Sequence, residues 1–369
     1  MGDFRWDVHT SLFLRSLLKP GLPMQYTTAD TQRVSKLTLV YFCVTGLDLL
    51  GKLDNLSESD NAAVKKWVLS QQVRSAHIDG TDWRRCGFRG GSFGGNPFET
   101  CEVVSTSKGY SDNSDNGNGA IAAKPGGAMD EGNLAMTYSA LATLVALGGD
   151  IAGVGGEAIL QELRSLQQQD GSFQASASDS TCDLRFTYCA CAVSSMLKNW
   201  DGVDRHKTVA YINRCYSFDG GVGLAPGRES CAGSTYCAVA SMELMGVLHG
   251  LSPARREGLV EWCVNRQRDG FQSRPNKVSS DSCCSFWVGA TLDLLGEMGL
   301  VDRAPARQFH MSCQNKVLAG GFAKAPDLLP DLLHSFYSVA WLSLSQELEA
   351  EEIDVSLGIT KRARALLPL

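Results

Sequence analysis

A run of apolar and small residues recurs along this chain about every 50 residues, and this repeat limits the possible folds more than any other feature. The runs are LAMTYSALATLVALGG (134–149), LRFTYCACAVSSMLKN (184–199), GSTYCAVASMELMG (233–246), SCCSFWVGATLDLLG (282–296) and LLHSFYSVAWLSL (332–344). Each contains an aromatic residue, and these residues are Tyr138, Tyr188, Tyr236, Trp287 and Tyr337. Their successive spacings are 50, 48, 51 and 50 residues.

Between these runs lie segments of a second kind, such as LRSLQQQDGSF, INRCYSFDGGV, VNRQRDGFQ and MSCQNKVLAGGF. Each reads as a helix that is charged on one face and ends in a glycine turn. A helix that is apolar all round must be buried, and a one-sided helix covers it. With an earlier pair at 37–51 and 64–72, the pattern predicts about six helix pairs closed into an α/α toroid, as one domain over 1–369. Parallel inner helices would then begin around one central cavity.

Composition excludes several classes of protein. Of the 369 residues, 44% are hydrophobic, which is ample for a large core. A net charge of −6 argues against a nucleic-acid-binding surface. No run of about 18 apolar residues predicts a membrane span, and the first residues do not resemble a secretory signal. We therefore expect reduced thiols for the 13 cysteines and a cytoplasmic location, and we read 105–119 as a low-complexity loop within the ring.

Three potential metal ligands occupy similar positions in successive repeats. Asp281 and Cys283 open one inner helix, and His334 opens the next, 53 residues after Asp281. Each residue alone has an ordinary structural explanation: a helix cap, a core thiol or a buried histidine. Neighbouring helices of a ring would bring the three together, however. A carboxylate, a thiolate and an imidazole suit Zn²⁺ and leave its fourth position open, which is the catalytic pattern.

The motifs DSCCSFWVGAT, SRPNK, GGFAKAPDLLPDLLHSFY, CDLRFTYCA and ESCAGSTYC resemble those of protein prenyltransferase β subunits, especially the type-I geranylgeranyltransferases. The resemblance runs from about Asp7 to Leu344. It implies a six-fold α/α toroid, one zinc held by Asp281, Cys283 and His334, and an obligate α-subunit partner. It also implies transfer of a geranylgeranyl group from its diphosphate to the cysteine of a C-terminal Cys-a-a-Leu protein, such as a small GTPase.

The resemblance further assigns substrate contacts. Arg274 and Lys277 would face the diphosphate, and Lys324 replaces a magnesium-binding aspartate, so Mg²⁺ should not be required. Thr38 replaces a bulky tryptophan of farnesyltransferases and would leave depth for a fourth isoprene unit. The rest of the isoprenoid wall would be Tyr138, Tyr188, Gly233 with its neighbour Ser234, Cys237 and Trp287. The peptide pocket would contain Asn133, Ala135, Arg185, Phe186 and Leu333.

The chain departs from the family at three positions that the resemblance places near the substrates. Cys231 and Cys284 stand where the family usually has a histidine and a tyrosine that contact the diphosphate, and Asn133 replaces a histidine. Loss of each diphosphate donor should weaken catalysis by a factor of roughly 10² to 10³, if they act like other oxyanion donors. Three alternatives stay open: a Rab-type geranylgeranyltransferase, a farnesyltransferase β subunit, and a non-catalytic zinc-binding toroid scaffold. A terpene cyclase would need an Asp-x-Asp-Asp cluster, which the sequence lacks.

Overall fold

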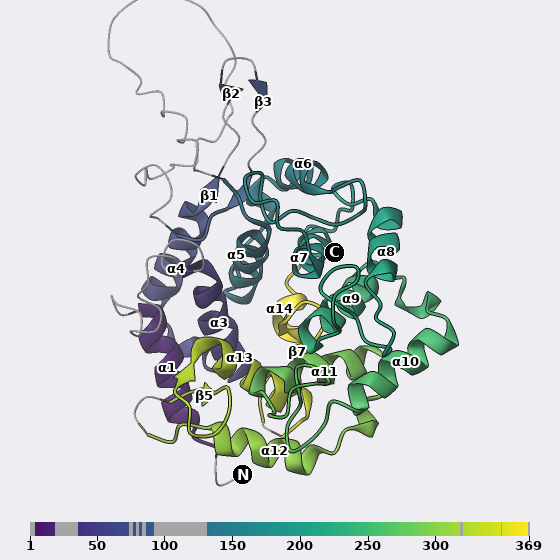
Figure 1. Cartoon of the computed structure of the whole chain (residues 1–369). Helices are drawn as coiled ribbons and strands as arrows, with labels where there is room; N and C mark the ends of the chain where they lie inside the picture. Colours follow the sequence, from purple (N-terminus) through teal and green to yellow (C-terminus); the bar gives the residue numbers. More distant parts are fainter. Residues whose placement is uncertain are drawn as a thin grey trace, which may run out of the picture.

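The computed structural model describes residues 4–18, 36–73, 77–78, 81–82, 86–91, 131–317, 320–347 and 349–367. The loop predicted at 105–119 lies outside this part of the chain. Six inner helices of the described residues form a ring, in which each helix packs against the next and α13 returns to α3 (Figure 1). They are α3 (Lys36–Leu49), α5 (Leu134–Ala146), α7 (Leu184–Met196), α9 (Ala232–Leu244), α11 (Ser282–Leu294) and α13 (Leu332–Leu344). The predicted α/α toroid is confirmed.

Outer helices surround this ring and cover it (Figure 1). They are α1 (Trp6–Leu18), α4 (Glu58–Ser70), α6 (Gly156–Leu166), α8 (Arg205–Arg214), α10 (Pro253–Val264) and α12 (Arg303–Cys313). Helix α6 is typical, since it buries Ile159, Leu163 and Leu166 on one face and exposes charged residues on the other. Within the described part of the chain, every helix is too short or too polar to span a bilayer.

The remaining elements are short connections. The 3₁₀ turns are Leu53–Asn55, Ala152–Val154, Leu248–Gly250 and Met298–Leu300, and α14 is Lys361–Arg364. The strands are β1 (Gln72–Val73), β2 (His77–Ile78), β3 (Thr81–Asp82), β4 (Gly87–Phe88), β5 (Phe322–Ala323), β6 (Pro330–Asp331), β7 (Ile353–Asp354) and β8 (Ile359–Thr360). They pair as antiparallel ladders β1–β4, β2–β3, β5–β6 and β7–β8. In the β5–β6 hairpin Phe322 lies opposite Asp331, so the hairpin brings the segment before α13 back toward α11.

The inner helices are rich in small residues because each is enclosed on all sides. A Cβ atom on Gly289 of α11 would overlap the ring of Trp341 on α13, so glycine allows these two helices to approach. An N–H in the first turn of each of five inner helices also donates to a loop carbonyl of the next repeat. These bonds run from Leu37 to Gly90, Leu134 to Ala175, Leu184 to Leu224, Ala232 to Ser273 and Ser282 to Lys324. The ring is thus joined at the end where its helices begin.

The other end of the ring holds the turn 355–358 between β7 and β8, which we call the plug. Four tyrosines from successive inner helices donate their hydroxyl groups to its four consecutive carbonyls. The bonds are Tyr236 to Val355 (2.8 Å), Tyr188 to Ser356 (3.1 Å), Tyr138 to Leu357 (2.8 Å) and Tyr41 to Gly358 (2.6 Å). Figure 1 shows α14, which follows the plug, inside the ring. Inward-facing aromatic residues therefore hold the C-terminal segment in place.

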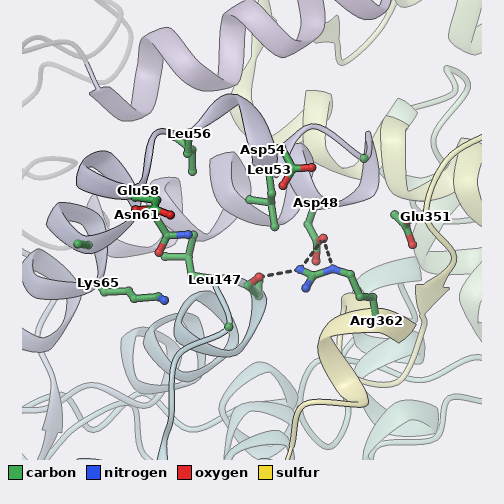
Figure 2. Close-up of a pocket in the computed structure, with 14 residues that line it drawn as sticks. Asp48, Leu53, Asp54, Leu56, Glu58, Asn61, Lys65, Leu147, Glu351 and Arg362 are labelled. Atoms are coloured by element: carbon green, nitrogen blue, oxygen red, sulfur yellow. Dashed lines mark hydrogen bonds and ion pairs between the residues drawn. The ribbon is translucent and has the colours of Figure 1, made fainter.

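An ion pair between an exposed arginine and a buried aspartate fixes the chain after the plug (Figure 2). Arg362 donates to Asp48 at 2.7 and 2.9 Å and to the carbonyl of Ala146, while Thr360 donates to the other oxygen of Asp48 at 2.6 Å. Burial raises the pKa of Asp48 despite these partners. These groups line a polar cavity of about 620 Å³ at the C-terminal ends of α3 and α5. Its lining residues join helices to the C-terminal segment, so we assign it a structural role.

Candidate functional site

The predicted site residues gather in the first turns of the inner helices. Five described inner helices have 13 residues each, and the residue before each helix is its N-cap. These caps are Asn133, Asp183, Cys231, Asp281 and Asp331. All except Cys231 accept a hydrogen bond from an N–H of their own helix. The second helical residues are Ala135, Arg185, Gly233, Cys283 and Leu333, and the third include Thr38, Phe186, Cys284 and His334.

Asp281, Cys283 and His334 lie in contact, as predicted from their spacing. The Oδ1 atom of Asp281 lies 3.0 Å from Sγ of Cys283 and 3.4 Å from Nε2 of His334. The first two residues come from the start of α11 and the third from the start of α13, which is the adjacent helix. Carboxylate, thiol and imidazole groups this close fit a zinc ion, which binds all three ligand types. Their assignment as zinc ligands stays a prediction.

A further thiol lies in the same group. The side-chain donor atoms of Asp281, Cys283 and Cys284 all lie within 4.8 Å of one another. The Cys284 side chain is buried, with an exposed fraction of 3%. The resemblance assigned Cys284 to the diphosphate, whereas its sulfur lies beside the predicted metal ligands.

Asp331 is a site residue that the sequence reading missed. Its Oδ2 atom lies 2.5 Å from Nδ1 of His334, and its Oδ1 atom accepts the backbone N–H of His334 at 2.8 Å. The same carboxylate therefore caps α13 and fixes the imidazole ring so that Nε2 faces Asp281. A carboxylate in this position orients a metal-binding histidine and increases its basicity. The available signal was an aspartate three residues before the histidine at a helix start.

The pKa values of the side chains in this cluster are strongly shifted from their ordinary values. Burial alone would raise the pKa of Asp281, but its hydrogen bonds with His334 and Cys283 hold that pKa below its ordinary value. Burial disfavours a charged His334, yet its hydrogen bonds, chiefly with Asp281 and Asp331, raise its pKa to about 11. The pKa of Cys283 is raised, first by its hydrogen bond with Cys284 and then by burial. Binding of a metal ion here must therefore release protons.

One cationic side chain contacts this cluster, and two more lie on the loop before α11. The Nζ atom of Lys324 lies 3.4 Å from Oδ2 of Asp281, with its side chain half exposed. Arg274 pairs with Glu229 at 3.3 Å, and Lys277 is exposed on the same loop before α11. The loop and the β5–β6 hairpin thus bring positive charge to the mouth of the ring. Their assignment to a diphosphate stays a prediction.

The predicted isoprenoid wall divides into two levels. Thr38 is partly exposed, and its hydroxyl lies 3.4 Å from that of Ser139. Tyr138 and Tyr188 are buried deeper, where their hydroxyl groups hold the plug, so they form the floor of the ring. Cys237 and Gly233 lie on α9, and partly exposed Trp287 on α11 packs against Tyr236 and Tyr337.

The structure also corrects the register of the aromatic repeat. Tyr138, Tyr188 and Tyr236 are the fifth residues of their helices, and the fifth residues of α11 and α13 are Phe286 and Phe336. Trp287 and Tyr337 therefore lie one residue later than the true repeat position. One residue corresponds to about 100° around a helix, so these two rings point in a different direction from the tyrosines.

The predicted peptide pocket lies on α5, α7 and α13. Asn133 accepts N–H groups of α5 through its side-chain oxygen. Arg185 forms an ion pair with Asp183 at 2.7 Å and lies over the ring of Phe186. Ala135 is partly exposed and Leu333 is exposed. Next to this group, Cys231 leaves α9 without a side-chain cap, and its sulfur lies 2.9 Å from the Ser234 hydroxyl.

Comparison with known proteins identifies the family. Residues 4–359 match the prenyltransferase alpha-alpha toroid domain. The chain is 38% identical to the geranylgeranyl transferase type-1 subunit beta of Arabidopsis thaliana, over 97% of this chain and 89% of that protein. It is 36% identical to the protein of the same name from Dictyostelium discoideum, over 95% and 94%. The Pisum sativum protein farnesyltransferase subunit beta is 34% identical over 52% of the chain.

Among solved structures, Candida albicans protein geranylgeranyltransferase-I complexed with GGPP has the same fold. The TM-score is 0.78 at 24% identity, covering 99% of this chain and 98% of that one. From its closed ring of helix pairs and its near full-length relatives, the chain belongs to the prenyltransferase alpha-alpha toroid family, as a β subunit of the geranylgeranyl transferase type-1 group.

Proposed function

We propose that this chain uses zinc to transfer a geranylgeranyl group from geranylgeranyl diphosphate to the cysteine of a C-terminal Cys-a-a-Leu sequence. One observation carries the proposal: Asp281, Cys283 and His334 converge from the starts of two adjacent inner helices. The donor is favoured by the type-1 relatives and by the GGPP named with the Candida albicans protein.

Zinc, held by these three residues, would bind the substrate thiol and lower its pKa so that the sulfur is a thiolate near neutral pH. The substrate thiolate attacks C1 of the allylic diphosphate. A carbon–sulfur bond forms while the carbon–oxygen bond breaks, and the diphosphate leaves with the electron pair. Within the protein, Asp331 holds the His334 ring in the orientation that directs Nε2 toward the ligand cluster.

Negative charge grows on the leaving diphosphate, and preorganised cations stabilise such charge. Lys324 is the best placed of these cations, because it already lies 3.4 Å from Asp281. A fixed ammonium beside the reacting centre supplies the charge that a magnesium ion would otherwise bring. Arg274 and Lys277 approach from the loop before α11, so the proposed enzyme does not require Mg²⁺.

The proposed donor chain lies along the inner helices, with Thr38 at its far end. A threonine leaves room that a tryptophan would fill, which favours a C20 donor over a C15 donor. The peptide lies across the starts of α5, α7 and α13, near Asn133, Arg185 and Leu333. We further propose a heterodimer with a prenyltransferase α subunit, in the cytoplasm.

The test is co-expression with a candidate α subunit, followed by assay of both donors on peptides ending in Leu and in Ser. We expect transfer of the C20 group to the Leu peptide without an escort protein and without Mg²⁺. Purified protein should hold about one zinc per chain, and His334→Ala should lose most of it while staying folded. Transfer only in the presence of an escort protein would instead support a Rab-type enzyme. Full zinc in a folded His334→Ala variant would refute the ligand assignment.

A further inference from the structure

Helix α11 begins with two adjacent thiols, and the proposed chemistry uses only one of them. Cys283 and Cys284 are its second and third residues, and both sulfurs lie within 4.8 Å of the Asp281 carboxylate and of each other. Two sulfurs bound to one tetrahedral zinc would lie roughly 3.8 Å apart, given zinc–sulfur bonds of about 2.3 Å. Small side-chain rotations would therefore suffice to bring both sulfurs onto one metal ion.

Comparison along the ring shows that the third helical position can supply a ligand. On α13 this position is His334, which is itself a proposed ligand. On α9 it is Ser234, whose hydroxyl turns away to donate to the carbonyl of Val222 at 2.6 Å. Cys284 has the position of His334 on the adjacent helix, and its sulfur lies among metal-binding groups. A cysteine that only fills the core would not need these neighbours.

We propose that Cys284 is a fourth protein ligand of the metal, as a second thiolate beside Cys283. This inference rests on the proposed zinc site of Asp281, Cys283 and His334. Two thiolates make the donor set softer and favour thiophilic ions such as Cd²⁺ over Zn²⁺ more strongly than one thiolate does. Four protein ligands also complete a tetrahedral site. The substrate thiol must then compete with Cys284 for its place on the metal.

Cobalt substitution tests this directly, because absorption by Co²⁺–thiolate charge transfer increases with the number of bound sulfurs. The full chain, together with its α subunit where the two form a complex, is stripped of metal and titrated with Co²⁺. We expect about twice the charge-transfer absorption per cobalt in the unaltered chain as in Cys284→Ser, and a similar loss in Cys283→Ser. Cys182→Ser is the matched control, since that thiol is partly exposed at the turn before α7 and should not change the band.

The outcomes separate the two levels of the proposal. Equal bands in the unaltered chain and in Cys284→Ser would overturn the fourth-ligand assignment and leave the three-ligand zinc site intact. Failure of the unaltered chain to bind Co²⁺ at the site would instead refute the proposed zinc site itself. Because Cys284 is buried, Cys284→Ala is measured as well, since it removes the sulfur without burying a hydroxyl. The inference requires the same halved band from this variant, with an unchanged helical circular dichroism spectrum.

Discussion

Asp331→Asn should weaken zinc binding without unfolding the ring, because one amide cannot replace both functions of the carboxylate. In the native chain one oxygen accepts the His334 backbone N–H at 2.8 Å and the other lies 2.5 Å from Nδ1 of its ring. If the amide oxygen keeps the cap, the amide NH₂ faces Nδ1. The ring proton must then move to Nε2, the atom that faces Asp281. That tautomer has no lone pair for a metal ion.

If the amide flips instead, its oxygen accepts the Nδ1 proton of His334 and the helix cap is lost. Loss of the cap should lower the stability of the fold by about 1 kcal/mol. Loss of such an orienting partner typically costs about 10–100-fold in metal affinity, which is roughly 1.4–2.7 kcal/mol. Competition with a chromophoric chelator measures the zinc dissociation constant, and a thermal melt of the metal-free protein measures the cap. We expect the dissociation constant to rise within that range.

Asp302→Asn is the matched control. Asp302 caps α12 by accepting the N–H of Ala304 at 3.3 Å, in the same chemical role but without a histidine partner. Its substitution should leave the zinc dissociation constant unchanged. Wild-type zinc affinity in Asp331→Asn would refute the reasoning, since His334 would then need no carboxylate to bind, or would not be a ligand.

Three further predictions concern other parts of the ring. Thr38→Trp should fill the end of the proposed pocket and shift the preference from the C20 to the C15 donor by at least about 1–3 kcal/mol. Competition between the two donors measures this shift, and an unchanged donor ratio would contradict the pocket assignment. Burial lowers the pKa of His310 to about 3. Below its ordinary pKa of about 6.5 the unfolded chain therefore binds one more proton than the folded chain at this residue. The free energy of unfolding should fall by roughly 1.4 kcal/mol for each pH unit from pH 6.5 toward pH 3. Urea unfolding of His310→Leu should therefore show a shallower loss of stability between pH 7 and 5.5 than the parent, and an equal slope would contradict this reasoning. Tyr188→Phe should lower the free energy of unfolding by about 1–3 kcal/mol, because the buried Ser356 carbonyl loses its hydrogen-bond donor. Tyr216→Phe, which lies away from the plug, is the control. An equal effect of the two substitutions would argue against the role of the plug hydroxyls.

The repeat predicted the ring and the end of the ring at which chemistry gathers. Because inner helices that share a direction begin at the same end, residues one repeat apart, such as Asp281 and His334, could be paired from spacing alone. The repeat could not distinguish Trp287 from Phe286 as the true aromatic position, since the spacing read from the sequence itself varies by three residues, from 48 to 51. A one-residue error turns a side chain by about 100° on a helix, so the direction of each ring had to come from the structure.

Two other features were outside the reach of periodicity. Asp331 resembles an ordinary helix cap in sequence, and its second oxygen is seen to orient His334 only when the rotamer is known. The plug follows the last repeat, in a segment with no matching copy elsewhere in the chain. Adjacent thiols posed a similar problem, because sequence alone did not show whether Cys284 faces the diphosphate side or the metal side.

The four tyrosines bind the plug through its backbone carbonyl groups, so the residues of the plug differ in how well they should tolerate substitution. Carbonyl groups are the same in every amino acid, so the four tyrosine hydroxyls place little restriction on the identity of residues 355–357. Gly358 is different, because its φ is +66° and a Cβ atom there would come within 2.8 Å of the Tyr41 hydroxyl. Related chains could therefore differ at residues 355–357, within the limits that burial sets on side-chain size and polarity, while keeping the same backbone path. Searches for shared function by sequence alone would overlook a contact that depends on tyrosines nearly 120–320 residues away.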